Sequence, residues 1–365
     1  MRQAYLYTLL AVMFWTTGPV GSKAALLAER DGVRLSATQV AFWGVGLGWA
    51  GLVVVLALKG RLRRLGDISG RGWLVLVGMG LFGWVGYQVG MNLAYERLSL
   101  PTALMISYLN PVCVVLFQGS VFGRVVRRVS GWEQRGENAR RFPVVRLALG
   151  LGLCLLGVAV IVTGGRMLLE APRSVAGVLA ALFAAVAWGV YSNLGRFVAV
   201  RSGREASGLG DVQNLGAMAI GLAVMAAGLA KAGELTPPVG FSTALYLAGP
   251  TQTRVDAWGP IVVLAALNYV GGYTLWLYAL ERGDREGQAH KLPPLTYLVL
   301  VTAVGLGWMV FREALEAGFW EGAALIALGN VVTLWPAHNR IHRKGAEDAG
   351  TEKEAGQQAP RLPSG

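Results

Sequence analysis

Long apolar runs, separated by short polar segments, make up most of this chain. Ten of them, each about 17–25 residues long, could cross a hydrocarbon core about 30 Å thick as α-helices. They lie at about residues 4–26, 37–58, 73–95, 100–122, 144–165, 175–200, 209–230, 258–280, 292–311 and 319–335. The segment 231–257 is more polar and is interrupted by prolines, so its structure is left open. The pattern predicts an all-α integral membrane protein with ten transmembrane helices.

The composition agrees with this prediction. Of the 365 residues, 54% are hydrophobic and only 15% are charged, against about 25% charged residues in soluble domains. This low polar content excludes a disordered protein, a secreted disulfide scaffold and an ordinary nucleic-acid-binding domain. The two cysteines, Cys113 and Cys154, lie inside apolar runs, and the three histidines show no metal-ligand spacing. We therefore expect no metal and no cofactor.

The positions of Lys and Arg predict the orientation in the membrane. If the N-terminus is cytoplasmic, 24 of the 33 cations lie in cytoplasmic segments, eight lie outside, and Lys23 lies within the first helix. Cytoplasmic loops carry the excess of Lys and Arg. We therefore expect a multi-pass protein of the plasma or inner membrane, with the lipid bilayer as its partner and both termini in the cytoplasm. The polar stretch 337–365 is expected to be a disordered cytoplasmic tail.

A weak internal repeat relates the two halves of the chain. In the first and sixth predicted helices, a Trp is followed eight positions later by a cation. The third and eighth helices end in Ala-x-Glu-Arg. The fifth and tenth helices carry Gly-x6-Gly. The residues are Trp15 with Lys23 and Trp188 with Arg196; Ala94 to Arg97 and Ala279 to Arg282; Gly150 with Gly157 and Gly322 with Gly329.

Five helices per half mean that the second half enters the membrane inverted. We therefore predict two inverted five-helix repeats, over residues 1–165 and 166–336, with a basic cytoplasmic loop at 124–142 in the first. Inverted repeats are a transporter architecture with the substrate site near the midplane between the halves.

These motifs, together with the segment TALMISYLNPVCVVLF around Pro111, resemble the EamA-like family of the drug/metabolite transporter superfamily over residues 1–336. The resemblance implies a ten-helix carrier, with an exporter of amino acids or related small metabolites as the first expectation, working by alternating access. The chain departs from the family at Gly123-Arg124, where Gly-Glu is usual, whereas Phe311-Arg312-Glu313 keeps the Glu. A coupling ion and a homodimer are left open.

Polar and aromatic side chains inside the predicted helices are candidates for a substrate cavity. Polar groups are costly in lipid and face either an aqueous cavity or another helix. In the third helix Gln88, Asn92 and Tyr95 share one face by the i, i+4, i+7 rule. In the fourth helix Pro111 removes a backbone hydrogen bond, and freed backbone at membrane depth is tolerated where a cavity or a neighbour satisfies it.

The full set of candidates comes from five helices. It consists of Trp15, Gln88, Asn92, Ser107, Tyr108, Asn110, Pro111, Trp188, Tyr191, Asn268, Tyr273 and Trp276. The alternative for the polar members is hydrogen bonding between helices, and the alternative for the aromatic members is packing or a belt at the membrane interface.

Four charged residues near helix ends are candidate gates. Lys23 and Glu96 fall near the predicted outer end, and Arg196 and Glu281 fall near the inner end. Such a pair could close one gate while its counterpart opens. The alternative is that each cation extends to the membrane interface and each Glu pairs with its own loop.

Two other classes of function are an intramembrane enzyme and a non-transporting membrane scaffold. Gly-Leu-Gly-Asp at 208–211 matches the Gly-x-Gly-Asp of intramembrane aspartyl proteases. That chemistry needs a second carboxylate that shares a proton, and the other aspartates lie in loops or the tail. As a helix cap, Asp211 needs no catalytic role. A non-transporting membrane scaffold would not need the inverted repeat, so we predict a transporter and not an enzyme.

Overall fold

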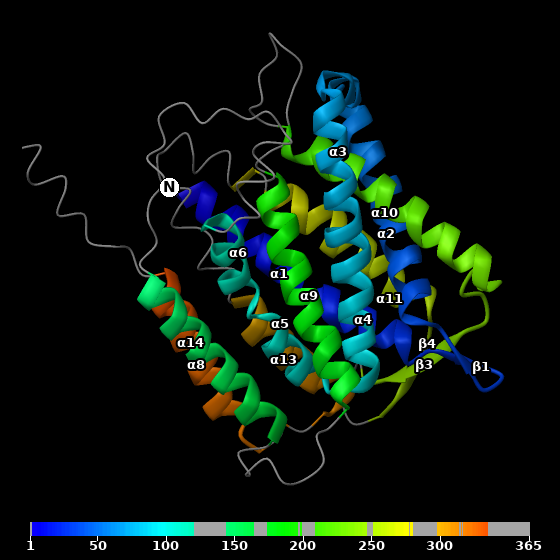
Figure 1. Ribbon diagram of the computed structural model, residues 1–365. Helices are drawn as coiled ribbons and strands as arrows, with labels where there is room; N and C mark the ends of the chain where they lie inside the picture. Colours follow the sequence, from blue (N-terminus) through cyan, green and yellow to red (C-terminus); the bar gives the residue numbers. More distant parts are fainter. Residues whose placement is uncertain are drawn as a thin grey trace, which may run out of the picture. The chain divides into compact units, whose positions relative to one another are not determined.

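The computed structural model describes most of the helical part of the chain (Figure 1). The described residues are 2–119, 144–163, 174–195, 198, 209–246, 251–276, 278–279, 298–313, 315 and 317–334. Residues Met1–Thr333 form one compact unit, to which all the contacts below belong. The predicted loop 124–142, the predicted tail 337–365, Arg196 and Glu281 lie outside the described residues.

Helices occupy each of the ten segments that the apolar pattern predicted. The first half contains α1 (Arg2–Leu26), α2 (Ala37–Leu58), the short 3-10 helix η1 (Leu62–Asp67), α3 (Gly70–Met79), the π-helical segment η2 (Gly80–Tyr87), α4 (Gln88–Arg97), α5 (Leu100–Ser107), α6 (Asn110–Gly119) and α8 (Val144–Thr163). The second half contains α9 (Val175–Leu194), α10 (Gly210–Ala232), α11 (Trp258–Val263), the π-helical segment η4 (Leu264–Gly272), α13 (Leu298–Phe311) and α14 (Phe319–Leu334).

Five helices in the described residues are long and apolar enough to cross a membrane. They are Ala37–Leu58, Gly70–Arg97, Val175–Leu194, Gly210–Ala232 and Trp258–Trp276. Shorter apolar helices cover Ala148–Ile161, Leu298–Phe311 and Phe319–Val332. The protein is therefore a mostly helical membrane protein, and the number of ten crossings stays a prediction.

Serine residues begin several of these helices. The Ser36 side chain accepts a hydrogen bond from the backbone of Gln39, whose own side chain accepts from the backbone of Ser36. Ser69 and Ser99 accept in the same way at the starts of α3 and α5. A capped helix start satisfies backbone N–H groups that would otherwise lack partners.

A small sheet corrects the expectation of an all-α protein. Its strands are β1 (Glu29–Arg30), β2 (Val33–Arg34), β3 (Ser242–Leu245) and β4 (Thr253–Asp256), in the order β2-β1-β3-β4 and all antiparallel. Asp31 and Gly32 connect β1 to β2 with positive φ angles of 52° and 81°, the conformation of a two-residue hairpin turn. Because β3 pairs with β1, the sheet joins the two halves. We call the end of the helical unit that carries it the sheet end.

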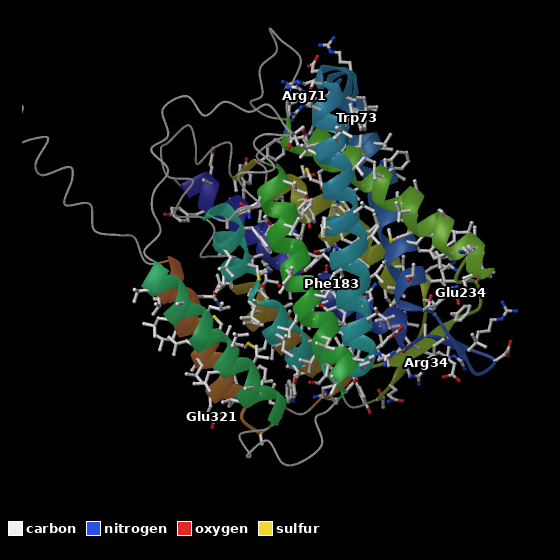
Figure 2. All side chains as sticks on the ribbon, viewed as in Figure 1. Arg34, Arg71, Trp73, Phe183, Glu234 and Glu321 are labelled. Atoms are coloured by element: carbon white, nitrogen blue, oxygen red, sulfur yellow. The ribbon has the colours of Figure 1, made fainter. Side chains whose placement is uncertain are left out.

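Figure 2 shows Arg34, of β2, and Arg71, at the start of α3, at opposite ends of the helical unit. We call the end of Arg71 the opposite end.

The packing of the helices is reciprocal between the halves. Helices α1 and α2 pack against η4 of the second half, and α9 and α10 pack against η2 of the first half. The alignment that pairs Ala94 with Ala279 also pairs Gly80, the first residue of η2, with Ala265 in η4. Reciprocal contacts at matching positions are what a two-fold relation between two repeats produces, and they support the repeat that the sequence predicted.

The four glycines of the two Gly-x6-Gly motifs meet where the fifth and tenth predicted helices cross. A Cβ atom built on Gly157 of α8 would lie 2.6 Å from the carbonyl oxygen of Gly322 in α14, and one built on Gly329 would lie 2.5 Å from that of Gly150. The helices α8 and α14 run side by side in Figure 1. Small residues permit this close backbone approach.

Candidate functional site

An aromatic network occupies the seam between the two halves. It consists of Trp15, Trp84, Tyr87, Trp188, Tyr191, Tyr269, Tyr273 and Trp276, which come from α1, η2, α9, η4 and the turn of helix after η4. The network contains five of the predicted cavity residues, from three helices that are distant in sequence.

Trp15 joins α1 to the helix that follows η4. Its ring centroid lies 5.6 Å from that of Tyr273 and 5.5 Å from that of Trp276. The edge of the indole lies against Gly272, where a built Cβ atom would lie 2.7 Å from Nε1. The glycine therefore lets the indole of Trp15 reach the backbone of the second half.

Trp84 is the centre of the network. It is 1% exposed, and its ring centroid lies 5.5 Å from Tyr269, 5.7 Å from Tyr273 and 6.5 Å from Tyr191. Edge-on and tilted contacts at such distances contribute about 0.5–1.5 kcal/mol each beyond area burial. Trp84 therefore links the eighth predicted helix to the sixth.

Trp188 completes the network on α9. Its ring centroid lies 4.8 Å from that of Tyr87 and 5.3 Å from that of Tyr191. The hydroxyl of Tyr191 donates to Oδ1 of Asn214 in α10 over 3.0 Å. The phenol therefore has a polar partner, as buried tyrosines usually do.

Two buried indole N–H groups in the network have no hydrogen-bond partner among the described residues. They belong to Trp15 and Trp84. A buried donor without a partner is costly, so a ligand that brings an acceptor between these rings gains by satisfying it.

Gln88 and Asn92 occupy the predicted buried face of the third helix. Gln88 is 8% exposed, and its Oε1 accepts from the hydroxyl of Tyr269 over 2.9 Å. Asn92 is 2% exposed, and its Nδ2 donates to the carbonyl of Ala37 over 3.0 Å. Both residues therefore make hydrogen bonds between helices, which was their alternative role, and Gln88 also borders the aromatic network through Tyr269.

Asn268 packs on α1 through a glycine. A Cβ atom built on Gly18 would lie 2.7 Å from the side chain of Asn268, and one built on Gly83 would lie 2.2 Å from the ring of Tyr191. The repeat alignment pairs Gly18 with Tyr191 and Gly83 with Asn268. The same pair of positions is therefore in contact twice at the seam, with the glycine on α1 in one contact and on η2 in the other.

The fourth predicted helix, expected as one run with a backbone hydrogen bond removed at Pro111, is divided into two helices just before Pro111. Helix α5 ends at Ser107 and α6 begins at Asn110. Around the break, the Ser107 hydroxyl donates to the carbonyl of Leu104 over 2.8 Å, and Nδ2 of Asn330 donates to the carbonyl of Tyr108 over 3.3 Å. The carbonyl of Tyr108 at the break therefore has a partner from α14. Asn110 is half-buried, and the side chain of Pro111 lies outside the described residues.

The predicted gate partner of Lys23 is corrected. Lys23 forms an ion pair with Glu313, at the end of α13, and not with Glu96. The Glu96 carboxylate instead lies near the backbone of Ala37, at the start of α2, where the helix dipole favours an anion.

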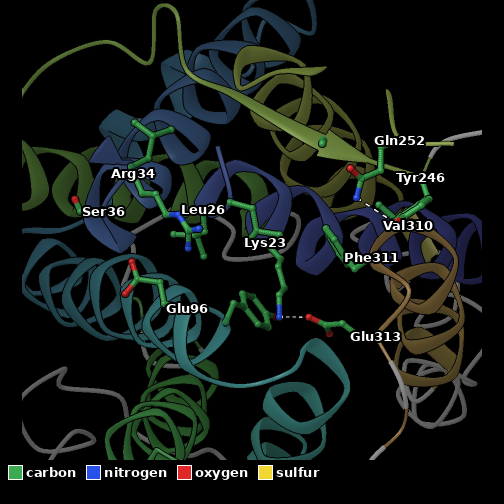
Figure 3. A pocket seen from close by; sticks show the side chains of 14 residues that line it. Lys23, Leu26, Arg34, Ser36, Glu96, Tyr246, Gln252, Val310, Phe311 and Glu313 are labelled. Atoms are coloured by element: carbon green, nitrogen blue, oxygen red, sulfur yellow. Dashed lines mark hydrogen bonds and ion pairs between the residues drawn. The ribbon is translucent and has the colours of Figure 1, made fainter. Parts of the chain in front are cut away.

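A cavity of about 550 Å³ lies at the sheet end (Figure 3). Its charged lining residues are Lys23, Arg34, Glu96 and Glu313. Apolar walls come from Leu26, Leu35, Val310 and Phe311, and further polar groups come from Tyr246 and Gln252. This cavity is not lined by any of the twelve predicted cavity residues, and it contains two of the four predicted gate charges.

Comparisons with known proteins agree with the fold and with its division into two halves. The EamA-like transporter family matches residues 2–130 and 175–335, one stretch in each half. The chain belongs to the EamA-like transporter family. Twelve chains of solved structures also match. One of them, described as "Crystal structure of protein", covers 91% of this chain and 96% of its own length, with 22% identity and a TM-score of 0.52, which shows a shared fold. A comparison with curated proteins found no match.

Membership in the EamA-like family identifies a membrane transporter family and not an enzyme family. Asp211, the aspartate of the protease-like motif, lies in the first turn of α10 and forms an ion pair with Arg61 over 2.6 Å. Its Oδ1 also accepts from the backbone N–H of Val212 over 2.8 Å. Asp211 therefore lies in the first turn of α10, as predicted, but it is not the cap: the N-cap is Leu209, and no side chain makes a capping hydrogen bond there.

Sequence reasoning missed Trp84, Tyr87 and Glu313 as site residues of this EamA-like protein. Trp84 lies four positions before Gln88, so the rule that grouped Gln88 with Asn92 would have included it. Glu313 carried the family resemblance but was not connected to Lys23, which lies in the other half.

Proposed function

We propose that this EamA-like protein carries a small metabolite out of the cell by alternating access, with amino acids and related compounds as the first candidates. The substrate site is the aromatic network with Gln88. The main support is the position of this network on the seam, where α1 and α9 contact the π-helical segments of opposite halves. A site on the seam changes when the halves rock against each other.

The chemistry of the network favours a substrate that is partly flat and carries a hydrogen-bond acceptor. Aromatic faces bind apolar or cationic groups. The unpartnered indole N–H groups of Trp15 and Trp84 favour an acceptor such as a carboxylate. π-Helical segments such as η2 and η4 occur frequently at functional sites.

The orientation belongs to the same proposal. The excess of Lys and Arg in alternate loops supports cytoplasmic termini in the plasma or inner membrane. With this orientation the sheet end faces outward, and a substrate leaves the cell past the sheet.

Flux of radiolabelled amino acids in proteoliposomes tests the proposal. The substitutions Gln88→Ala, Asn110→Ala and Tyr273→Ala should lower flux, and for Tyr273 the loss should be about tenfold, equivalent to about 1.4 kcal/mol. Each variant should keep its abundance in the membrane. Tyr5→Ala, which removes a half-buried tyrosine outside the network, is the matched control and should keep its flux.

Two results would contradict the proposal. If all three variants keep full flux, the substrate site lies elsewhere. If reconstituted protein moves none of the amino acids or related metabolites in a panel, the non-transporting scaffold becomes the better account.

A further inference from the structure

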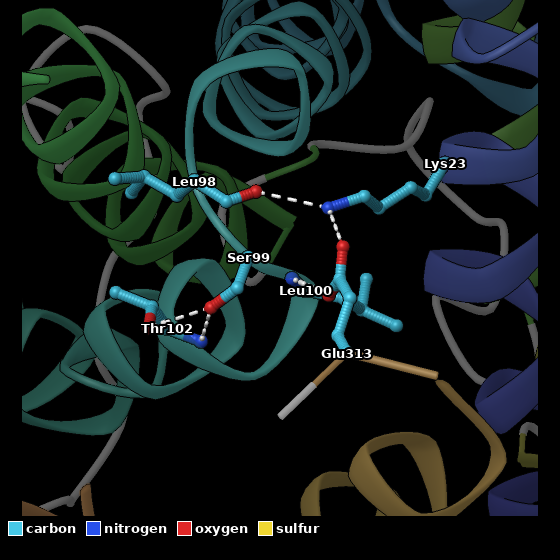
Figure 4. A network of polar contacts seen from close by, with 6 residues as sticks. All are labelled: Lys23, Leu98, Ser99, Leu100, Thr102 and Glu313. Atoms are coloured by element: carbon cyan, nitrogen blue, oxygen red, sulfur yellow. Dashed lines mark hydrogen bonds and ion pairs between the residues drawn. The ribbon is translucent and has the colours of Figure 1, made fainter. Parts of the chain in front are cut away.

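The ion pair between Lys23 and Glu313 is part of a four-membered polar contact at the sheet end (Figure 4). Nζ of Lys23 also donates to the carbonyl of Leu98 over 3.0 Å. The Glu313 carboxylate also accepts from the backbone N–H of Leu100 over 2.8 Å. We call Lys23, Glu313 and the backbone of Leu98–Leu100 the latch.

The latch connects three elements from both halves. Lys23 lies in the last turn of α1, Leu98–Leu100 form the corner between α4 and α5, and Glu313 follows α13 of the second half. The corner is itself ordered by Ser99, whose Oγ accepts from the backbone N–H of Thr102. Movement of the second half away from α1 and the corner therefore has to separate Glu313 from both partners.

The backbone before Glu313 is strained in a way that serves the latch. Helix α13 ends at Phe311, and Arg312 has a φ of 56°, in the left-handed region where glycine is usual. The guanidinium of Arg312 is held over the rings of Trp308 and Tyr246, 5.4 and 5.6 Å from their centroids. Strain of this kind persists where the surroundings enforce it and often marks switch regions.

The latch is buried but borders the cavity. The Lys23 side chain is 8% exposed and that of Glu313 is 22% exposed, and both line the cavity at the sheet end. A buried ion pair is stable while both partners are present and becomes costly when one is left alone. The pair therefore has two favourable states: an ion pair in contact, or two separated charges hydrated from the cavity. Arrangements between these two states are unfavourable.

We propose that the latch is the gate of this carrier at the sheet end. It holds the second half against α1 and the α4–α5 corner while that end is closed, and it separates when that end opens. The proposal rests on the transport function proposed above, and it names Glu313 as the gate partner of Lys23.

The two backbone contacts determine the polarity of the latch. The carbonyl of Leu98 is an acceptor, so the side chain at position 23 has to be a donor. The N–H of Leu100 is a donor, so the side chain at position 313 has to be an acceptor. Exchange of the charges, Lys23→Glu with Glu313→Lys, would place a carboxylate against a carbonyl and an ammonium against an N–H. The charge exchange should therefore fail to restore the gate. In a simple ion pair without these backbone contacts, the same exchange would restore it.

Thiol labelling of purified protein in detergent tests the gate without a known substrate. Reporter cysteines replace Ser107, 2% exposed in α5, or Ser192 in α9, in a chain with Cys113→Ala and Cys154→Ala. Helix α9 begins beside Leu98, against which Gly177 packs, and ends beside Gly78, which contacts Leu194. Ser107 lies in α5, whose first residue Leu100 belongs to the latch, and Ser192 lies near the end of α9 beside Gly78, so the two thiols report on the sheet end and on the opposite end.

Loss of the latch should open one end at the expense of the other. In Glu313→Gln or Lys23→Met, the thiol at position 107 should react about tenfold faster and the thiol at 192 should react more slowly. The double variant should be no faster at 107 than the faster single variant, because both remove the same contact. Glu96→Gln makes the same chemical change at another carboxylate of the cavity and should leave both rates unchanged.

Three outcomes would overturn the gate. The first is an unchanged rate of labelling at position 107 in the latch variants. The second is faster labelling at both positions, which indicates a general loosening of the protein. The third is an increase in Glu96→Gln as large as that in Glu313→Gln. The unfolding temperature of each variant, followed by tryptophan fluorescence, identifies variants that fail to fold, and Lys23→Arg, which keeps charge and donors, should retain slow labelling. Because no substrate is used, absence of flux in proteoliposomes would count against the proposed function and leave this result intact.

Discussion

The crossing of α8 and α14 allows a sharp test of the packing between the halves. In Gly157→Ala the new methyl would lie 2.6 Å from the carbonyl oxygen of Gly322 and 3.0 Å from the backbone nitrogen of Ile326. Both atoms belong to the backbone of α14, so no side chain can rotate to make room. The helices must move apart by roughly 0.5–1 Å, a gap that forfeits about a quarter to a half of each dispersion contact along the crossing.

We expect Gly157→Ala to lower the free energy of unfolding by about 1–3 kcal/mol, the usual cost of overpacking. Gly152→Ala is the matched control, because the two glycines share α8 and a Cβ atom on Gly152 meets nothing within 4 Å. Because alanine has a higher helix propensity than glycine, Gly152→Ala should raise the free energy of unfolding by up to about 1 kcal/mol. The two variants carry the same chemical change with opposite expected signs.

Thermal unfolding in detergent measures this difference. In a chain with Cys113→Ala, a thiol-reactive dye reports on Cys154, which is fully buried at the crossing and contacts Ile326. Tryptophan fluorescence reports on the whole chain. The unfolding temperature of Gly157→Ala should fall by about 2–4 °C for each kcal/mol lost. Equal unfolding temperatures for Gly157→Ala and Gly152→Ala would refute the close approach of the two helices.

The remaining predictions concern orientation and the aromatic network. A reporter fused at Gly365 should read cytoplasmic and one inserted in 231–257 should read external, and a periplasm-active reporter that works at the C-terminus would reverse the orientation. Trp84→Ala should lower the free energy of unfolding by about 3–5 kcal/mol, because Trp84 is 1% exposed with three tyrosine contacts. Trp320→Ala, at a residue 67% exposed, is its control and should stay within about 0.5 kcal/mol of the parent.

The positions of several helices could be predicted closely from the sequence. The apolar run 37–58 became α2 over the same residues, and the runs at 144–165 and 319–335 became α8 and α14 with ends within two residues. This success has a local cause. In lipid every backbone polar group must be satisfied within its own segment, so a long apolar run has helix as its main solution.

The repeat and the buried polar face were also legible in the sequence. The Gly-x6-Gly pairs meet in one crossing, and Gln88, Asn92 and Tyr95 are all buried. Spacing along a helix determines which side chains share a face, so both features follow from periodicity. The hairpin at Asp31-Gly32 was a local signal of the same kind, and the expectation of an all-α chain overlooked it.

The partners of these residues were decided by the tertiary structure. Gln88 accepts from Tyr269, 181 residues away, and Asn92 donates to Ala37, 55 residues away. The sequence contains several tyrosines and carbonyls that would serve equally well chemically. Only the packing of η4 and α2 against the third helix selects these two.

The partner of Lys23 shows the same limit most clearly. Glu96 was predicted as the partner because its helix end and that of Lys23 fall near the same side of the membrane. The structure selects Glu313 because the α4–α5 corner presents the carbonyl of Leu98 to the ammonium and the N–H of Leu100 to the carboxylate. Hydrophobic periodicity carries no information about such a corner, since it exists only after two helices have packed and left their terminal backbone groups facing a third.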